Sequence, residues 1–171
     1  MTAAAESTWQ GALGRALVRG GVEAAAWVPD KRLSPIASAL VAESLPLHTL
    51  TREEECFAWA GGFRAAGGMP LVLVQCSGIG NSLNAIGSFV VPYGLGFPVL
   101  ISMRGALGER NPAQMALGRT TVSMLGVIGI QAFPLHRAED AGLVARGALE
   151  VAQGARELAP IILEPELDLE P

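Results

Sequence analysis

The strongest signals for the fold of this chain lie in residues 51–84, TREEECFAWAGGFRAAGGMPLVLVQCSGIGNSLN. Three consecutive glutamates precede a segment rich in small residues, then an apolar run, then a glycine-rich turn. Thr51-Arg52-Glu53-Glu54 matches a capping box, with Thr51 as the N-cap and Glu54 reaching back to its amide. We therefore predict a helix over residues 51–66 and a buried strand over 71–75.

The rest of the chain continues this alternation of helical and strand-like segments. We expect helices over 9–19, 34–44, 51–66, 83–89, 119–125 and 138–158. We expect strands over 22–28, 47–50, 71–75, 97–102, 127–130 and 160–163. Such alternation predicts a single three-layer α/β domain over residues 1–163, with a mostly parallel sheet and helices on both faces. Residues 164–171 are expected to form an acidic, mobile tail.

Composition limits the classes of function that the chain can have. Of its 171 residues, 50% are hydrophobic and only 16% are charged, which predicts a surface partly buried against another subunit. A net charge of −4 argues against nucleic-acid binding and against a basic membrane patch. A membrane span needs ~20 continuous apolar residues, and prolines and polar residues interrupt every uncharged run before that length. The first residues also lack a secretory pattern, so we expect a cytoplasmic protein. Cys56 and Cys76 predict buried free thiols, and we expect no metal site in this chain.

The residues alone leave several roles open for the three glutamates and the helix that follows them. Glu54 has a capping role in the predicted box, and the helix dipole favours Glu55 in the first turn. Glu53 is either another such acid or a functional group. The small residues over 58–65 allow close packing in the core, a helix pair at a subunit interface or a bound ring.

The turn Ser77-Gly78-Ile79-Gly80-Asn81 directly follows the predicted strand 71–75. Glycine at this place permits a sharp turn and a close approach of a ligand to the backbone. The turn is not a dinucleotide fingerprint, because Leu83 stands where the third glycine belongs. A plain strand-to-helix connection remains the alternative.

Cationic side chains follow two of the predicted strands. Arg104, Arg110 and Arg119 flank the loop after strand 97–102, and Lys31 and Arg32 follow the first strand. The carboxyl ends of parallel strands are where ligands bind in such sheets, and arginines there could hold an anionic substrate. Each of them could equally be the solvated charge of a surface loop.

Taken together, these motifs resemble the pyrimidine-binding domain of thiamine-diphosphate-dependent 2-oxoacid decarboxylases. Within that group the chain is most similar to sulfopyruvate decarboxylase alpha subunits and next to phosphonopyruvate decarboxylases. The resemblance spans about residues 20–130. It rests on Val28-Pro29-Asp30, Thr51-Arg52-Glu53-Glu54-Glu55, Ala60-Gly61-Gly62-Phe63, Gly68-Met69-Pro70, the run Gln75–Asn84, Ser102-Met103-Arg104-Gly105, Gly108-Glu109 and Gly118-Arg119.

The resemblance implies roles for particular residues. Counting back from Gly62, it places on Glu53 the glutamate that contacts N1′ of the cofactor's aminopyrimidine and shares a proton with it. A carboxyl group at a dry site holds its proton more tightly than in water, as that role requires. The residues implied to line the pyrimidine with Glu53 are Ser77, Gly78, Gly80 and Asn81. The residues expected to handle the substrate are Asp30, Arg32, Arg104 and Arg119.

The chain departs from the family in three places. Cys76 stands where asparagine is common, and Met103 where an aromatic residue or histidine is common. No Gly-Asp pair is present, although the family's diphosphate domain holds magnesium through a Gly-Asp-Gly motif and a downstream asparagine. The resemblance therefore implies a hetero-oligomer, in which a beta subunit binds the magnesium and the diphosphate of thiamine diphosphate.

The expected function is that of an alpha subunit of a 2-oxoacid decarboxylase, converting sulfopyruvate to sulfoacetaldehyde and carbon dioxide. Three alternatives remain open at this point. They are a phosphonopyruvate decarboxylase, a carboligase built on the same half-site, and a noncatalytic small-molecule-binding or regulatory module.

Overall fold

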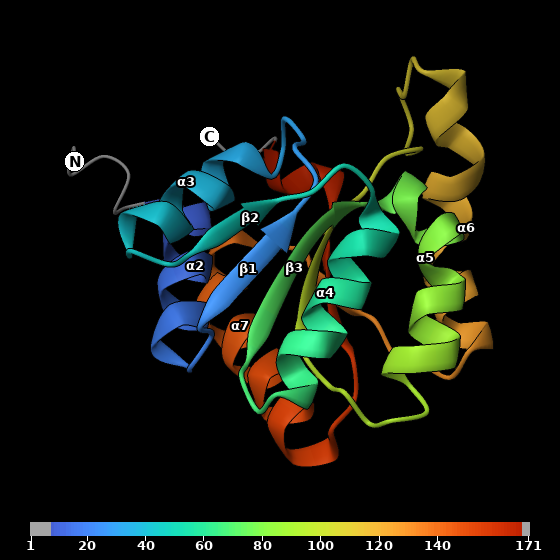
Figure 1. Cartoon of the computed structure of the whole chain (residues 1–171). Coiled ribbons are helices and arrows are strands. Elements are labelled where there is room, and N and C mark those ends of the chain that lie inside the picture. The colour runs from blue at the N-terminus through green and yellow to red at the C-terminus, as the bar shows by residue number, and fades with distance from the viewer. Residues whose placement is uncertain (1–7, 169–171) are drawn as a thin grey trace.

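The computed structural model describes residues 8–168, which form one sheet covered by helices on both faces (Figure 1). Its six strands are all parallel and lie in the order β2-β1-β3-β4-β6-β5. This confirms the predicted α/β class. The strands are β1 Ala24–Trp27, β2 Leu47–Thr49, β3 Pro70–Gln75, β4 Pro98–Ser102, β5 Phe133–Leu135 and β6 Ala159–Leu163.

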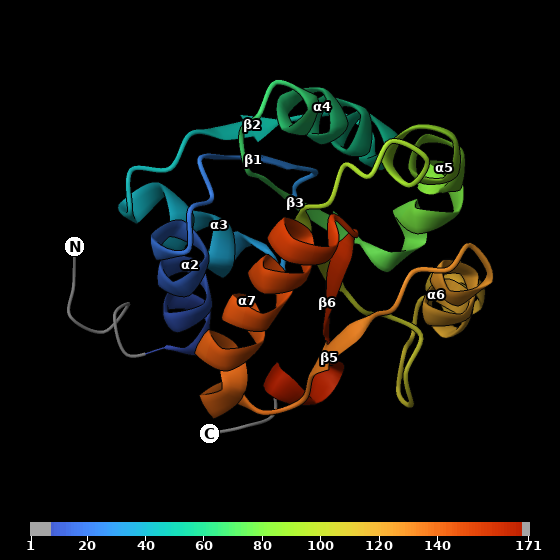
Figure 2. The same cartoon turned by 90° about the horizontal axis from the view of Figure 1, so that it is seen from below.

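The helices form two layers (Figure 2). The layer on one face holds α2 Trp9–Arg19, α3 Ser34–Ala42 and α7 Ala141–Glu150. The layer on the other face holds α4 Glu53–Ala65, α5 Ile79–Ala85 and α6 Met115–Val127. Short helical turns complete the path: η1 Cys76–Gly78, η2 Ile86–Val90, η3 Pro112–Gln114, η4 Ala138–Asp140, η5 Val151–Ala155 and η6 Pro165–Asp168. Within residues 8–168 we find no helix with the length and apolarity needed to cross a membrane.

Three inner strands of the sheet, β3, β4 and β6, lie within the hydrophobic core. Every residue of β4 and β6 is buried, and so are the first five residues of β3. A parallel strand covered on both faces needs this continuous apolar run. Gln75 pairs with Ser102 across β3 and β4, so both strands end at the same level and present polar side chains there.

The predicted strand over residues 127–130 is wrong. Helix α6 continues to Val127 and ends in a Schellman arrangement, in which the Ile130 amide donates to the Leu125 carbonyl at 2.9 Å. Gly129 supplies the left-handed conformation, with φ of +81°. Ile130 is buried at 7% exposure, so its hydrophobicity serves the helix terminus, and the strand β5 lies farther on at Phe133–Leu135.

Two further predictions need correction. The helix expected over 83–89 begins earlier, because η1 runs directly into α5 at Ile79. The described part of the expected mobile tail is packed: η6 follows β6, and Leu167 is only 2% exposed within the core. The end of that tail, residues 169–171, lies outside the described residues.

Both cysteines are buried free thiols, as predicted. Burial raises the pKa of Cys56 to about 12, and it also raises the pKa of Cys76. A thiol that holds its proton is a poor nucleophile, so neither cysteine is suited to covalent catalysis.

Candidate functional site

The first turn of α4 gives its three glutamates different surroundings. Arg52 is the N-cap, with φ of −138° and ψ of 147°. Glu55 Oε2 accepts from the backbone amides of Thr51 and Arg52, each at 3.1 Å, and from Thr51 Oγ1 at 2.8 Å. These hydrogen bonds, that from the Thr51 hydroxyl first, lower the pKa of Glu55. The predicted capping box of Thr51 and Glu54 is therefore wrong by one residue, since Glu55 is the acid that closes the cap.

Glu54 and Glu53 differ in whether they have partners. Glu54 Oε1 lies 2.5 Å from Arg52 Nε in an ion pair at the surface. Its other oxygen, Oε2, is buried without a hydrogen-bond partner in the described part of the chain. Glu53 is half-buried, and within residues 8–168 its carboxyl group has neither a hydrogen bond nor an ion pair. Of the three acids, Glu53 alone is free of a structural task in this part of the chain.

The carboxyl group of Glu53 lies against the glycine turn that follows β3. A Cβ atom built at Gly78 would stand 2.1 Å from Glu53 Cδ, a distance that real atoms do not adopt. Gly78 is therefore needed for Glu53 to occupy this place. The two residues come from α4 and η1, which the fold brings together at the carboxyl end of the sheet.

The other residues predicted to bind the cofactor lie along the same turn and helix. Ser77 is half-buried, and its hydroxyl donates to Gln75 Oε1 at 2.6 Å. Gly80 faces α6, where a Cβ atom would be 3.4 Å from a Leu117 methyl group. Asn81 is exposed on α5. The structure thus brings Glu53 and Gly78 into contact and places Ser77 beside them in sequence.

Asp30, which follows β1, hydrogen-bonds to the last residues of β3 and β4 at the carboxyl end of the sheet, where the strand order reverses. Its Oδ2 accepts from Gln75 Nε2 at 2.8 Å, and its Oδ1 accepts from Ser102 Oγ at 3.2 Å. Oδ1 also accepts from the Arg32 amide at 3.0 Å. Both carboxylate oxygens are therefore engaged in ordering the edge.

Gln75 and Ser102, which complete this network, were not among the predicted site residues. Each is the polar residue that ends an otherwise apolar strand. That position is the signal that could have identified them, because the carboxyl edge of a parallel sheet is where ligands bind.

The predicted substrate arginines differ in their contacts. Arg32 Nη1 donates to the carbonyls of Met103 at 2.9 Å and Leu163 at 3.2 Å, and its Nη2 donates to the Glu164 carbonyl at 2.9 Å. Arg32 thereby ties the loop after β1 to the ends of β4 and β6. Arg119 is exposed on α6.

Arg104 forms a two-pronged ion pair with Glu109. Its Nε and Nη2 lie 2.7 and 2.9 Å from the two carboxylate oxygens. This hydrogen bonding lowers the pKa of Glu109 to about 2 and raises that of Arg104. The pair closes the start of the loop after β4.

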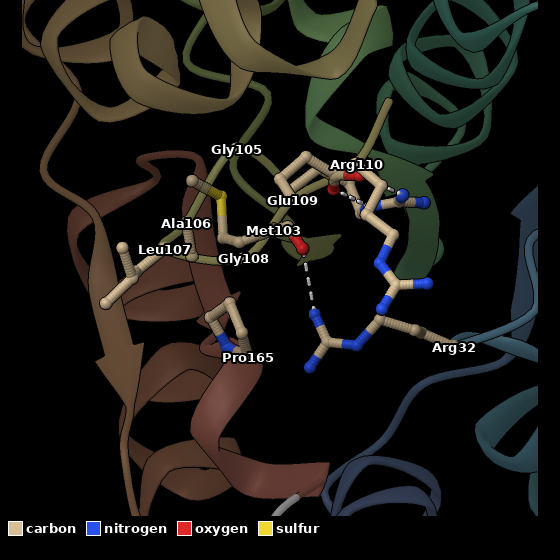
Figure 3. Close-up of a pocket in the computed structure, with 10 residues that line it drawn as sticks. Arg32, Met103, Gly105, Ala106, Leu107, Gly108, Glu109, Arg110 and Pro165 are labelled. Atoms are coloured by element: carbon tan, nitrogen blue, oxygen red, sulfur yellow. Dashed lines mark hydrogen bonds and ion pairs between the residues drawn. The ribbon is translucent and has the colours of Figure 1, made fainter. Parts of the chain in front are cut away.

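A cavity of about 430 Å³ opens beside this loop (Figure 3). The base of the loop is held by two glycines. Gly105 has φ of +79°, and a Cβ atom at Gly118 would lie 2.2 Å from the Arg104 carbonyl oxygen. Helix α6 can therefore lie directly on the loop. The cavity is lined by Arg32, Met103, Arg104, Gly105, Ala106, Leu107, Gly108, Glu109, Arg110 and Pro165.

Comparison with known proteins supports a single family. No family model matches the chain. The sulfopyruvate decarboxylase subunit alpha of Methanococcus maripaludis is 31% identical over 151 residues, which are 88% of this chain and 90% of that protein. Sulfopyruvate decarboxylase of Methanosarcina acetivorans is 33% identical over 136 residues, 80% of this chain and 35% of that protein. Phosphonopyruvate decarboxylase of Streptomyces hygroscopicus is 30% identical over 151 residues, 85% of this chain and 37% of that protein.

The fold also occurs in a solved structure of a larger enzyme. A chain of 2-oxoglutarate:ferredoxin oxidoreductase from Magnetococcus marinus superposes with a TM-score of 0.76 over 94% of this chain and 29% of that chain, at 14% sequence identity. That likeness concerns the fold alone. This chain spans about a third of the Methanosarcina and Streptomyces proteins but nearly all of the Methanococcus subunit. Because its match to the Methanococcus subunit covers nearly all of both chains, this chain belongs to the family of sulfopyruvate decarboxylase alpha subunits.

Proposed function

We propose that this chain is the pyrimidine-binding alpha subunit of a thiamine-diphosphate-dependent decarboxylase that converts sulfopyruvate to sulfoacetaldehyde and carbon dioxide. The names of its relatives support a decarboxylase, and the designation alpha supports a hetero-oligomer. A beta subunit would bind the diphosphate and magnesium. In residues 8–168 no three His, Cys, Asp or Glu side chains cluster in a way that could hold a metal ion.

The position of Glu53 carries the proposal. An aminopyrimidine ring needs an acid beside N1′. Glu53 offers a half-buried carboxyl group without a partner in the described chain, and the missing Cβ of the buried Gly78 makes room for it at the turn after β3. This acid supports binding of the ring at the turn.

Glu53 would hold and exchange a proton at N1′ of the bound cofactor. Thiamine diphosphate supplies, when bound, the electron sink that loss of carbon dioxide from a 2-oxoacid requires. Ser77, Gly80 and Asn81 would line the same side of the site along η1 and α5. The protein's contribution is to place the acid and to keep the surrounding edge ordered.

The remaining predicted residues would act on the substrate side. Asp30 and Arg32 order the strand ends, and Arg104 borders the cavity beside them. Arg119 lies on α6 outside the lining of that cavity, so its proposed role requires the substrate or the partner chain to reach α6.

Glu53→Gln tests the proposal in the complex reconstituted with its partner, thiamine diphosphate and magnesium. We expect kcat for sulfopyruvate to fall at least ~100-fold, the scale of losing a positioned proton-transfer group. Glu54→Gln is the matched control, because it alters the adjacent acid, and we expect kcat near the wild-type value. A noncatalytic module would instead leave both variants equally active.

Phosphonopyruvate is the second candidate substrate, because the Streptomyces relative is named for its decarboxylation. Comparison of kcat/KM for the two acids in the same complex decides between them. Product analysis with and without an aldehyde acceptor separates decarboxylation from carboligation on the same half-site.

A further inference from the structure

Three arginines line the cavity beside the loop after β4, and two of them are already engaged. Arg104 is bound at both prongs by Glu109. Arg32 donates to three backbone carbonyls at the ends of β4 and β6. If either guanidinium turned toward a ligand, the Glu109 carboxylate or the backbone carbonyls would lose their hydrogen bonds. Such a loss costs free energy at a partly buried site. Neither arginine is well placed to bind an incoming anion.

Arg110 is the third, and its surroundings differ. It lines the cavity and is exposed, and within residues 8–168 it makes no hydrogen bond or ion pair. Figure 3 shows its side chain extending from the loop toward that of Arg32. Among the lining residues that the structure describes, the only carboxylate belongs to Glu109, and both of its oxygens already accept from Arg104. Arg110 therefore brings to the cavity a positive charge that none of these described lining groups neutralises.

The backbone on both sides of Arg110 is held in place. Glu109 is fixed by Arg104, and Glu109 Oε1 also accepts from the Asn111 amide at 2.9 Å. Asn111 Oδ1 accepts in turn from the Ala113 amide at 3.1 Å, which starts η3. The ion pair of Arg104 and Glu109 thus braces the loop so that Arg110 is presented to the cavity. Arg104 acts in this arrangement as a positioning residue.

We propose that Arg110 binds the acidic tail of the substrate and so gives the enzyme its preference for 2-oxoacids with a second anionic group. The inference rests on the proposed function, which it makes more specific. A guanidinium offers parallel N–H donors that match the oxygens of a sulfonate, a phosphonate or a carboxylate. A substrate with an uncharged tail would gain nothing from this residue.

Arg110→Gln tests this in the reconstituted complex, with sulfopyruvate, phosphonopyruvate and pyruvate as substrates. Loss of one charge-assisted hydrogen-bond partner is expected to lower kcat/KM for sulfopyruvate about 10- to 100-fold, mainly through KM. The value for pyruvate, whose tail is a methyl group, should not change. Arg110→Lys should restore part of the loss. Whether phosphonopyruvate responds as strongly as sulfopyruvate shows which anion the site prefers.

Arg19→Gln is the matched control, because Arg19 ends α2 just before β1 begins, at the opposite edge of the sheet. It removes the same charge and should leave all three substrates unaffected. Equal losses for sulfopyruvate and pyruvate in Arg110→Gln, or no loss for either, would overturn the inference.

A binding measurement keeps the inference separate from the proposed function. If the wild-type complex decarboxylates none of these acids, the proposed function has failed. Calorimetric titration with sulfoacetate, an unreactive sulfonate, then still tests Arg110. Weaker binding to Arg110→Gln than to the wild type supports the inference, and equal binding contradicts it.

Discussion

At the scale of single residues, Glu53, Glu54 and Glu55 show that position decides what an acid does. Glu55 accepts the capping hydrogen bonds, Glu54 pairs with Arg52, and Glu53 faces Gly78. The sequence pattern predicts an N-cap at Thr51, because Ser and Thr are common N-caps. The chain uses Arg52 instead, and this moves the reaching acid from Glu54 to Glu55. Three adjacent glutamates cannot be distinguished by residue type, so only the family resemblance singles out Glu53.

The contact between Glu53 and Gly78 gives a prediction at this scale. In Gly78→Ala the new Cβ would collide with Glu53, whose Cδ and Cβ would lie 2.1 and 2.6 Å away. The carboxyl group must move, so we expect kcat of the reconstituted complex to fall at least about 10-fold. Gly62→Ala is a suitable control, because nothing lies within 4 Å of a Cβ at that position. Full activity of Gly78→Ala would show that the contact is not needed.

At the scale of elements, the loop after β4 and the helix α6 form one unit. A Cβ at Gly118 would lie 2.2 Å from the Arg104 carbonyl oxygen and 2.9 Å from the Gly105 nitrogen. Both are backbone atoms that cannot rotate away. Gly118→Ala should therefore separate α6 from the loop and lower Tm, whereas Gly126→Ala, with open space at its Cβ, should raise Tm or leave it unchanged. Thermal unfolding of the two variants checks this.

The ion pair of Arg104 and Glu109 predicts a pH dependence of the same unit. The folded pKa of Glu109 is about 2, against an ordinary value of 4.5, chiefly because of its hydrogen bonds from Arg104. Since the folded value is depressed, the contribution to stability is complete above about 4.5 and is lost as pH falls toward 2. The difference in Tm between wild type and Glu109→Gln should therefore be constant from pH 7 to 5, as expected above the unfolded pKa, and shrink below it. A difference in Tm that stays the same at all pH values would contradict this prediction.

At the scale of the whole molecule, the apolar surface predicts association. Leu143 on α7 is 63% exposed, and Val122 and Val127 on α6 are 46% and 87% exposed. With half of its residues hydrophobic, the isolated chain should self-associate in sedimentation velocity at micromolar concentration. Addition of the proposed beta subunit should convert these species to one defined complex. A single sharp monomer boundary for the isolated chain would contradict the expectation.

Most of the fold was predictable because its strands are apolar and its helices alternate with them. The predictions failed where an apolar residue serves a helix end or a packed tail instead of a strand. The hydrophobicity of Ile130 suggests a strand, but Ile130 lies at the end of α6, and Leu167 packs into the core although acidic residues flank it in sequence. The strand-end positions of Gln75 and Ser102 mark them as candidate site residues, but their hydrogen bonds to Asp30 could not be predicted, because they are 45 and 72 residues from it in sequence. Only the sheet register brings them together.

The most direct test of the account is a structure of the assembled complex with thiamine diphosphate bound. We predict that the Glu53 carboxyl group lies within hydrogen-bonding distance, about 2.5–3.2 Å, of N1′ of the aminopyrimidine. The ring should lie beside Glu53 at the turn after β3, with its diphosphate held by the partner chain. A Glu53 side chain that points into solvent, with the ring bound elsewhere, would contradict the central claim.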